Sequence, residues 1–552
     1  MKKILILFFP IIIYSQVGYV ESGHPIYDFF DRAYSLQIIN DYNSFEKPFP
    51  RNEISNILQT LNRNRSKLNP IDQRLLDKYL IEFEYDIFTS TNNSSNLITS
   101  GFSQDLIDST EKYIYFYTDN SKFNLFAHAL FSSEYYSKSL NNINQNVSLI
   151  NYGLMFHGAF AENFGYYFKA TNGTYFGDKN LAREKPELRY NFKFSKEEEL
   201  NSGQNYFDFT EGFLSYQNDL ISFKIGRDRE NIGYGKIKTV LGNNAPPFDY
   251  FNFRLKYKSF AFSYMHGKLL GNSNIIIDSM QGLINNIEDK YFVYHKFSFN
   301  PSRDFNFGLG EIIIYSNRSL DFSYLNPLNF YKSIEHSNQD RDNSILFFDF
   351  RNNSIRGVTL FSSLFIDDLD FGKLGTNWYG NRFLFELGSI VTSFYQIIPM
   401  TFSFQYIRID PYFYSHHVSS NNLSNLGYLI SNSFQPNSSI ISSDFSMQVT
   451  DDIFISAGFK YAIHGSNIYN ANGKLIINNG GNFAEGFRIG DDDYVSSLSG
   501  EKEFIREYNF SLSYEIANNY FINLVILKNN SDLKFKPDNK ATYFSTQISL
   551  KL

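Results

Sequence analysis

One polar stretch in the middle of the chain carries residue types that could bind a charged or hydroxylated ligand. Its charged and aromatic members are Arg227, Asp228, Arg229, Glu230 and Tyr234. An arginine can hold the carboxylate of an acidic sugar through two parallel hydrogen bonds, and a tyrosine ring can stack on a sugar ring. The alternative is that these charges pair with one another in a salt-bridge network inside the protein. On the sequence alone we favour this alternative.

A second polar group lies further along the chain. Its members are Glu311, Arg318, Asp321, Tyr324 and Asn326. Carboxylate, guanidinium and amide groups of this kind could contact the hydroxyls of a glycan. They could also form a buried polar network that fixes a loop folding inward. The sequence does not rank the two groups, and both are candidate ligand-binding sites.

Other combinations that could do chemistry are weaker. Asp491, Asp492 and Asp493 stand in a loop rich in glycine and asparagine and could bind calcium, but carboxylates this close in sequence more often form a solvated loop. Histidines lie scattered through strand-like runs at positions 128, 157, 266 and 295. A hydrolase would need a Ser-His-Asn cluster, and the sequence singles none out. We therefore predict no metal site, no cofactor and no enzymatic activity.

The elements that must position these groups show an alternating pattern. From Phe251 to Tyr257 the apolar side chains take odd positions, and after Lys258-Ser259 the alternation resumes in the opposite phase through His266. A period of two gives a strand one apolar face and one face toward water. Two such runs across a two-residue turn predict a β-hairpin.

The same pattern recurs from about residue 91 to the end of the chain, with no convincing helix. Strand-like runs extend from 112–118 to 542–552. Long polar loops are expected at about 172–205, 270–289, 331–344, 409–441, 464–504 and 528–541. Short turns alternating with long loops are typical of outer-membrane barrels, with the turns in the periplasm and the loops outside. We predict an all-β transmembrane barrel of about 18 antiparallel strands over residues 91–552, closed by its last strand on its first because lipid cannot satisfy an open edge.

Residues 17–90 differ because their apolar residues recur at helical spacing. Helices are predicted to begin at Pro25, with Ser22 as a cap, at Arg51 and at Asn69-Pro70. We expect these helices to form a small N-terminal α-helical bundle that caps or plugs the periplasmic end of the barrel.

Composition agrees with an exported membrane barrel. The chain has 552 residues, a net charge of -7, 18% aromatic residues and no cysteine. Girdles of aromatic residues are a feature of membrane barrels, and a mean hydropathy of -0.32 fits one because every second strand residue faces water. Residues 1–16, with a charged start and a short apolar core, are predicted to be a secretory signal. The mild acidity gives no reason to expect a nucleic-acid partner. Two or more soluble β-sandwiches are the alternative fold.

Several motifs resemble the capsule assembly Wzi family. They are Gly23–Arg32 and Lys47–Ile54 in the helical region, then Gly226-Arg227-Asp228, Gly233-Tyr234-Gly235, Asn244–Asp249, Gly310-Glu311, Tyr315 and Asp321–Pro327. The resemblance implies an outer-membrane barrel of about 18 strands whose lumen is partly blocked by an N-terminal helical bundle. It also implies a lectin-like anchor for capsular polysaccharide at the cell surface.

Three functions stay open on the sequence. The first is a non-catalytic outer-membrane barrel that binds and anchors capsular or exopolysaccharide through its extracellular loops. The second is a diffusion channel, because a barrel of this size has room for an aqueous lumen. The third is a lipid or glycan hydrolase carried on the barrel. The expected partners are surface polysaccharide and outer-membrane lipid, and the barrel is expected to be monomeric.

Overall fold

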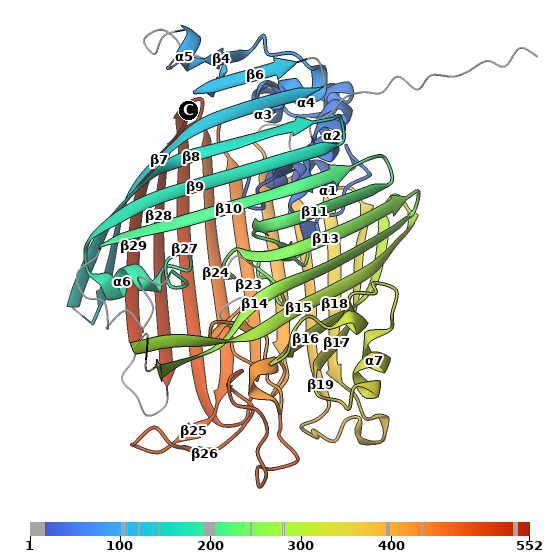
Figure 1. The fold of residues 1–552 in the computed structure, drawn as a ribbon, viewed down its shortest axis with the longest axis vertical. Coiled ribbons are helices and arrows are strands. Elements are labelled where there is room, and N and C mark those ends of the chain that lie inside the picture. Colours follow the sequence, from blue (N-terminus) through green and yellow to red (C-terminus); the bar gives the residue numbers. More distant parts are fainter. Residues whose placement is uncertain are drawn as a thin grey trace, which may run out of the picture.

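The chain folds into a closed antiparallel β-barrel with helices at one end (Figure 1). The computed structural model describes residues 17–552 apart from 101–105, 108, 120–121, 142, 192–204, 243–244, 279, 281, 394–397, 432–433 and 534–538. The predicted signal, residues 1–16, lies outside the described residues. The ring has 18 strands, which confirms the predicted fold class.

Each ring strand pairs antiparallel with the next one in the chain. The strands are β7 (Phe123–Leu140), β8 (Ile143–Phe160), β9 (Phe164–Gly177), β10 (Tyr206–Gln217), β11 (Ile221–Asp228), β13 (Phe248–Tyr257), β14 (Phe260–Asp278), β15 (Gly282–Ser302), β16 (Phe305–Ser316), β17 (Asn343–Ile355), β18 (Val358–Asp368), β19 (Arg382–Thr392), β20 (Met400–Ile409), β23 (Ser438–Gln448), β24 (Ile453–Ser466), β27 (Glu501–Ala517), β28 (Tyr520–Leu533) and β29 (Asn539–Lys551). The predicted alternation appears as two faces: along β13, even-numbered residues face the lumen and odd-numbered residues face outward.

The ring does not begin where the sequence predicted. The run 112–118 forms β5 (Glu111–Tyr113) and β6 (Tyr115–Asp119), and β6 pairs with the first residues of β7. The last strand, β29, pairs with β7 further along the same edge, from Leu130 to Leu140. The backbones of Leu552 and Ala129 bond each other at this seam. The first ring strand is therefore β7, which is long enough to pair with both neighbours.

The two ends of the barrel differ in the predicted way. One end, here called the turn end, has short connections such as 218–220, 258–259 and 518–519. The opposite end, the loop end, carries the connections 178–205, 229–247, 317–342, 410–437 and 467–500. Figure 1 shows the turn end at the top and the loop end at the bottom.

Two predicted loops and the predicted lack of helices beyond residue 91 were wrong. Of the predicted loop 528–541, residues 528–533 belong to β28 and residues 539–541 to β29. Most of 270–289 extends the hairpin of β14 and β15, because strand pairing overrides the turn-forming tendency of residues such as Gly271 and Asn272. Short helices too brief to show a helical period lie in the connections. They are α5 (Leu97–Ser100), α6 (Lys179–Glu184), α7 (Tyr331–Ser337), η4 (Phe322–Tyr324), η5 (Phe371–Lys373) and η6 (Ser419–Asn421). The other short strands are β1 (Tyr19–Val20), β2 (Glu46–Lys47), β3 (Phe49–Pro50), β4 (Ser94–Asn96), β12 (Asn231–Ile232), β21 (Ser424–Asn425), β22 (Tyr428–Leu429), β25 (Ile468–Tyr469) and β26 (Leu475–Ile477).

The N-terminal helices pack on one another through the apolar faces that the sequence predicted. This helical unit consists of α1 (Ile26–Ser35), α2 (Arg51–Arg63), η1 (Arg65–Lys67), α3 (Pro70–Glu82) and α4 (Glu84–Phe88). Asn69 caps α3, since its side chain accepts from the amides of Ile71 and Asp72 at 3.0 and 2.9 Å. Ser22 does not cap α1, which follows Pro25 without a side-chain cap. No helix among the described residues is long and apolar enough to cross a membrane.

The helical unit occupies the turn end of the barrel (Figure 1). Lys78 on α3 lies 2.9 Å from Glu515 on β27, and Lys256 on β13 lies 3.0 Å from Asp41. On β17, the Arg351 guanidinium donates to the carbonyl of Tyr42. The unit is therefore fixed to several strands around the ring.

Two connections from the loop end fold into the lumen and meet the helical unit. Residues 229–247 reach it through β12, which pairs with β2, and through Gly233, whose N–H donates to the carbonyl of Phe45 at 2.8 Å. Gly233 has φ of 120°, a conformation that a side chain would strain. Residues 410–437 pack beside this segment, with Leu423 and Ile430 fully buried in the cluster that includes Phe45. Protein therefore fills much of the lumen.

Candidate functional site in the barrel lumen

The first predicted group is organised around a lysine that the sequence analysis missed. Lys224 on β11 is fully buried, and its ammonium lies 3.0 Å from Asp228 and 2.7 Å from Glu230. The Tyr250 hydroxyl lies within hydrogen-bond distance of both carboxylates, at 2.6 Å from Glu230. Arg254 lies 3.4 Å from the other oxygen of Glu230. The acidic members of this group, Asp228 and Glu230, thus take part in a salt-bridge network inside the protein.

The two arginines of the first group lie apart from Lys224. Arg227 pairs with Asp249 on the exposed side of the wall, with two hydrogen bonds of 2.9 and 2.8 Å. Arg229 lines a lumen cavity, where its Nε has no hydrogen-bond partner among the described residues and lies 4.0 Å from Glu211. Of the charged residues in this group, Arg229 is the cation that lines the pocket and has a buried Nε without a hydrogen-bond partner among the described residues.

Tyr234, the aromatic member, joins the inward-folded segment to the wall. Its hydroxyl bonds Asn306 at 2.8 Å and Asp349 at 2.9 Å. Asp349 also lies 2.9 Å from the buried ammonium of Lys296. The Arg351 guanidinium stacks 5.3 Å from the Tyr234 ring. The ring of Tyr234 is therefore enclosed by protein.

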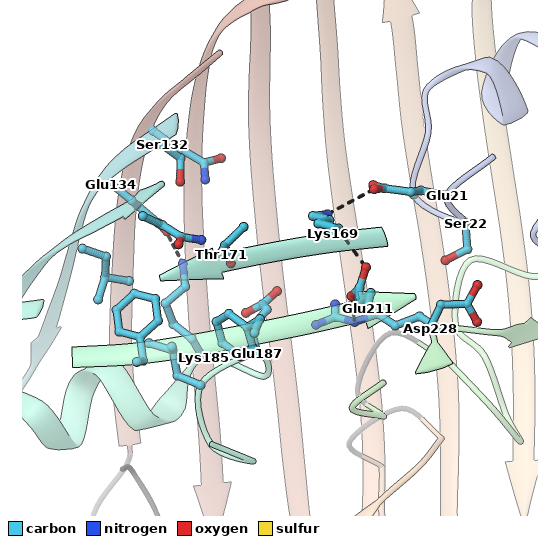
Figure 2. Close-up of a pocket in the computed structure, with 18 of the residues that line it drawn as sticks. Glu21, Ser22, Ser132, Glu134, Lys169, Thr171, Lys185, Glu187, Glu211 and Asp228 are labelled. Atoms are coloured by element: carbon cyan, nitrogen blue, oxygen red, sulfur yellow. Dashed lines mark hydrogen bonds and ion pairs between the residues drawn. The ribbon is translucent and has the colours of Figure 1, made fainter. Parts of the chain in front are cut away.

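A cavity of about 540 Å³, here called the lumen pocket, lies between the N-terminal segment and the connection that follows β9. Figure 2 shows Lys169 between Glu21 and Glu211 on one side of this pocket, and Lys185 with Glu134 on the other. Aromatic rings that also line it are Tyr19, Tyr167, Phe207, Phe209 and Phe213. Charged groups above a floor of rings can bind hydroxylated rings by hydrogen bonding and stacking.

The N-terminal segment is held against the pocket wall by Glu21. Its carboxylate accepts from Tyr167 at 2.6 Å and from Lys169 at 3.1 Å. The Lys169 ammonium holds the pKa of Glu21 at about 2. The segment also passes very close to β9, because a Cβ on Gly165 would lie 1.6 Å from the carbonyl oxygen of Val17. Sequence analysis could have nominated Lys169 and Glu211 as charges on the wet face of predicted strands.

A second cavity of about 520 Å³ continues from the lumen pocket toward the turn end, since both are lined by Tyr19, Glu21, Tyr167 and Lys169. Its wall includes Glu111 on β5, which is 1% exposed. Burial raises the pKa of the Glu111 carboxyl to about 7, and Lys551 at 3.7 Å opposes that shift only in part.

Substituting Glu111 should change how stability depends on pH. A carboxyl pKa that is higher in the folded chain than the ordinary 4.5 favours folding below pH 4.5, and this contribution is lost as pH rises to about 7. We expect Glu111→Gln to remove a slope of up to roughly 1.4 kcal/mol per pH unit between pH 5 and 7. Urea unfolding in detergent at several pH values measures it. The exposed Glu162→Gln is the control, and an equal slope in Glu111→Gln and wild type would contradict the prediction.

The second predicted group lies on the outer wall of the barrel, so the expectation of an inward-folding loop was wrong. Glu311 on β16 shares its face with Ile313 and Tyr315, while Ile312 and Ile314 face the lumen. The connection 317–342 covers this outer face. The Glu311 carboxylate accepts from the amides of Tyr331 and Lys332 at 2.8 and 3.0 Å.

The other members of the second group bond to residues within the same connection, 317–342. Arg318 pairs with Asp321 at 3.1 Å and with the buried Asp342 at 2.6 Å. The hydroxyl of Tyr324 donates to Asp342 at 2.7 Å. Asn326 is exposed and bonds Asn329 at 2.9 Å. Apart from the exposed Asn326, the group is a polar network that fixes the connection 317–342 to the outer wall.

The carboxylates of the candidate calcium site, Asp491, Asp492 and Asp493, do not converge on a common point. Asp491 pairs with Arg488 at 2.7 Å and accepts from Asn478 at 2.9 Å, while Asp492 accepts from the amide of Tyr494 at 3.0 Å. Among the described residues, the group of side chains close enough to share a metal ion is Glu335, His336 and Asp340. Glu335 is already held by Lys332 at 2.9 Å.

A closed ring with an apolar outer wall defines a transmembrane β-barrel, and its own chain fills part of the lumen. The family model described as capsule assembly protein Wzi matches residues 143–378, which confirms the resemblance over that part of the chain.

One solved structure confirms the fold. The chain is similar to Wzi of Escherichia coli, an outer-membrane protein involved in group 1 capsule assembly and a carbohydrate-binding β-barrel. The two are 11% identical, the match covers 97% of this chain and 99% of Wzi, and the TM-score is 0.58. OccAB4 of Acinetobacter baumannii matches at 10% identity over 78% and 98% of the two chains, with a TM-score of 0.45. A BenF-like porin of Pseudomonas fluorescens matches at 10% identity over 78% and 99%, with a TM-score of 0.44. No curated protein matches the chain.

Proposed function

We propose that this barrel binds and anchors capsular or exopolysaccharide at the cell surface without catalysing a reaction. The chain would be exported by residues 1–16 and would act as a monomer. The observation that carries the proposal is a pocket lined by charges and rings inside a lumen that loops and helices otherwise fill. Similarity to a family of capsule assembly proteins supports the same role.

Arg229 is the first residue we assign to the glycan. It lines the lumen pocket and its Nε has no hydrogen-bond partner among the described residues, whereas Asp228 and Glu230 are bonded to Lys224. Lys169 and Lys185 bring further cations to the same pocket, each paired with a carboxylate. Glu21, Glu134, Glu187, Glu211 and Asp228 line the same pocket, so its carboxylates outnumber its cations, and we propose that sugar hydroxyls make the polar contacts.

The proposal predicts that Arg229→Ala weakens polysaccharide binding. A hydrogen bond to a charged group contributes about 1.5–3 kcal/mol, so the dissociation constant should rise by roughly tenfold or more. Binding of purified protein to polysaccharide from its own source measures this. Arg303→Ala, at a largely exposed position on the turn-end connection, is the control. In cells, deleting the gene should release polysaccharide into the medium. Unchanged retention, together with no binding in vitro, would contradict the proposal.

A diffusion channel is the second candidate, favoured by one observation. The lumen pocket and the second cavity meet at Glu21 and Lys169, so space extends along one side of the lumen. Conductance across a planar bilayer separates the two functions. A stable open pore in the wild-type chain favours the channel, and a silent barrel that binds polysaccharide favours the anchor.

A further inference from the structure

The outer wall of β14, β15 and β16 is bare over half its height and covered over the other half. Near the turn end, exposed aromatic and aliphatic side chains form the wall. They are Phe260, Phe297, Phe299, Phe307 and Leu309. Nearer the loop end the outward residues are buried, because the connection 317–342 lies over them. They include Tyr264, His266, Tyr291, Val293, His295, Glu311, Ile313 and Tyr315.

The covered half lies within the height of a membrane. The strand β16 has 12 residues, and at a rise of about 3.4 Å and a tilt of about 40° it spans roughly 28 Å along the barrel axis, close to the apolar band of about 25 Å in this class of barrel. Glu311 stands near the middle of the strand. The connection that covers Glu311 therefore lies at the depth of the leaflet on the loop side.

The covering connection has two different outer surfaces. Over residues 320–330 the exposed side chains are apolar apart from Asn326: Leu320 is 40% exposed, Phe322 83%, Leu328 74% and Phe330 58%. Over residues 333–341 the exposed side chains are polar. They are Ser333, His336, Ser337, Gln339, Asp340 and Arg341. A surface that is apolar along one part and polar along the next matches the boundary between acyl chains and head groups.

Beneath the connection, no polar group of the outer wall is left facing the apolar surface. Glu311 bonds the two amides of α7 and lies 3.0 Å from His295. His266 bonds the hydroxyl of Tyr315 at 2.9 Å. Charged and polar side chains on a lipid-facing wall are costly unless they are satisfied, so the connection converts a polar part of the wall into an apolar one.

We infer that residues 320–330 are immersed in the acyl chains of the loop-side leaflet and form a lipid-contacting flap on the barrel wall. The apolar side chains of the flap continue the bare wall formed by Phe297, Phe307 and Leu309, which is the lipid-facing surface of the ring. The polar half, 333–341, then leads from the level of Glu311 toward the head groups. This inference rests on the membrane location and is independent of polysaccharide binding.

Single cysteines test the flap without interference, because the chain has no cysteine. A bimane label is attached at Leu328→Cys, at Leu309→Cys on the bare wall, at Ser337→Cys on the polar half and at Asn472→Cys in an exposed connection. Each protein is inserted into vesicles of phosphatidylcholine with either ordinary or brominated acyl chains. Folding is checked by heat-dependent gel mobility, and all four positions are surface-exposed or half-buried on the outside.

We expect brominated lipid to quench the label at Leu328 as strongly as the label at Leu309, and aqueous iodide to quench the labels at Ser337 and Asn472 instead. Quenching at Leu309 but not at Leu328, with iodide reaching Leu328, would overturn the inference while leaving the membrane location intact. Protection of Leu328 from both quenchers would indicate a second copy of the chain on this surface and would also overturn it. If lipid failed to quench Leu309, the membrane location itself would be wrong.

Discussion

Replacing Lys224 by methionine should lower the free energy of unfolding by about 3–5 kcal/mol, because breaking a buried ion pair leaves charge without compensation. Lys224 is fully buried and is the shared partner of Asp228 and Glu230. Its ammonium also lies over the rings of Tyr19 and Tyr250, at 4.4 and 5.0 Å. Methionine is unbranched and only one atom shorter than lysine, so the loss would come mainly from the unpaired carboxylates.

The measurement is urea unfolding of the folded barrel in detergent. Lys256→Met is the matched control, since Lys256 is half-exposed and its pairs with Asp41 and Glu53 should contribute less than about 1 kcal/mol. The triple variant with Lys224→Met, Asp228→Asn and Glu230→Gln should recover most of the lost stability, because no buried charge then lacks a partner. A triple variant as unstable as Lys224→Met would show that packing, and not charge, explains the loss.

Replacing Glu311 by alanine should detach the connection 317–342 from the outer wall. The carboxylate accepts from the amides of Tyr331 and Lys332 and bonds His295, so its removal leaves three buried groups unsatisfied. Hydrogen bonds to charged groups contribute about 1.5–3 kcal/mol each, and we expect a total loss near 3–5 kcal/mol after partial rehydration. Glu311→Gln should lose less, because its amide oxygen can still accept.

Proteolysis and unfolding together measure the effect of Glu311→Ala. A detached connection should be cleaved within 317–342 in intact vesicles, while the ring stays folded. Asp289→Asn serves as control, since Asp289 is half-exposed and pairs with a half-exposed Lys268. Wild-type protease resistance in Glu311→Ala would show that the apolar contacts of Tyr324 and Tyr331 suffice to hold the connection.

The ring could be predicted from the sequence because a period of two is a local property of each strand. The sequence also contains the information that the connection 317–342 folds over the outer wall. Glu311 shares its odd-numbered phase with Phe307, Leu309 and Ile313, so the pattern places a carboxylate on the apolar face. A charge on that face requires a cover from the outside. Grouping Glu311 with its polar neighbours leaves this phase information unused.

The pairing of the lumen charges could not be predicted in the same way. Glu21 and Lys169, or Arg351 and Tyr42, are brought together by the docking of the helical unit inside the ring. That docking depends on shape complementarity over the whole lumen, which no local pattern encodes. The prediction of a loop at 270–289 failed for a related reason. The conformation of these residues is fixed by the pairing of β14 with β15, and their own preference for turns does not decide it.

The seam between β7 and β29 determines how this molecule can be assembled. Its two edges come from opposite ends of the polypeptide, so one of them stays unpaired during synthesis and transport until the other has been made. Such an open edge is prone to pairing with other chains, and contacts between distant parts of a sequence form slowly. The topology therefore requires a chaperone that shields the unpaired edge and an assembly complex that brings both edges together at the bilayer.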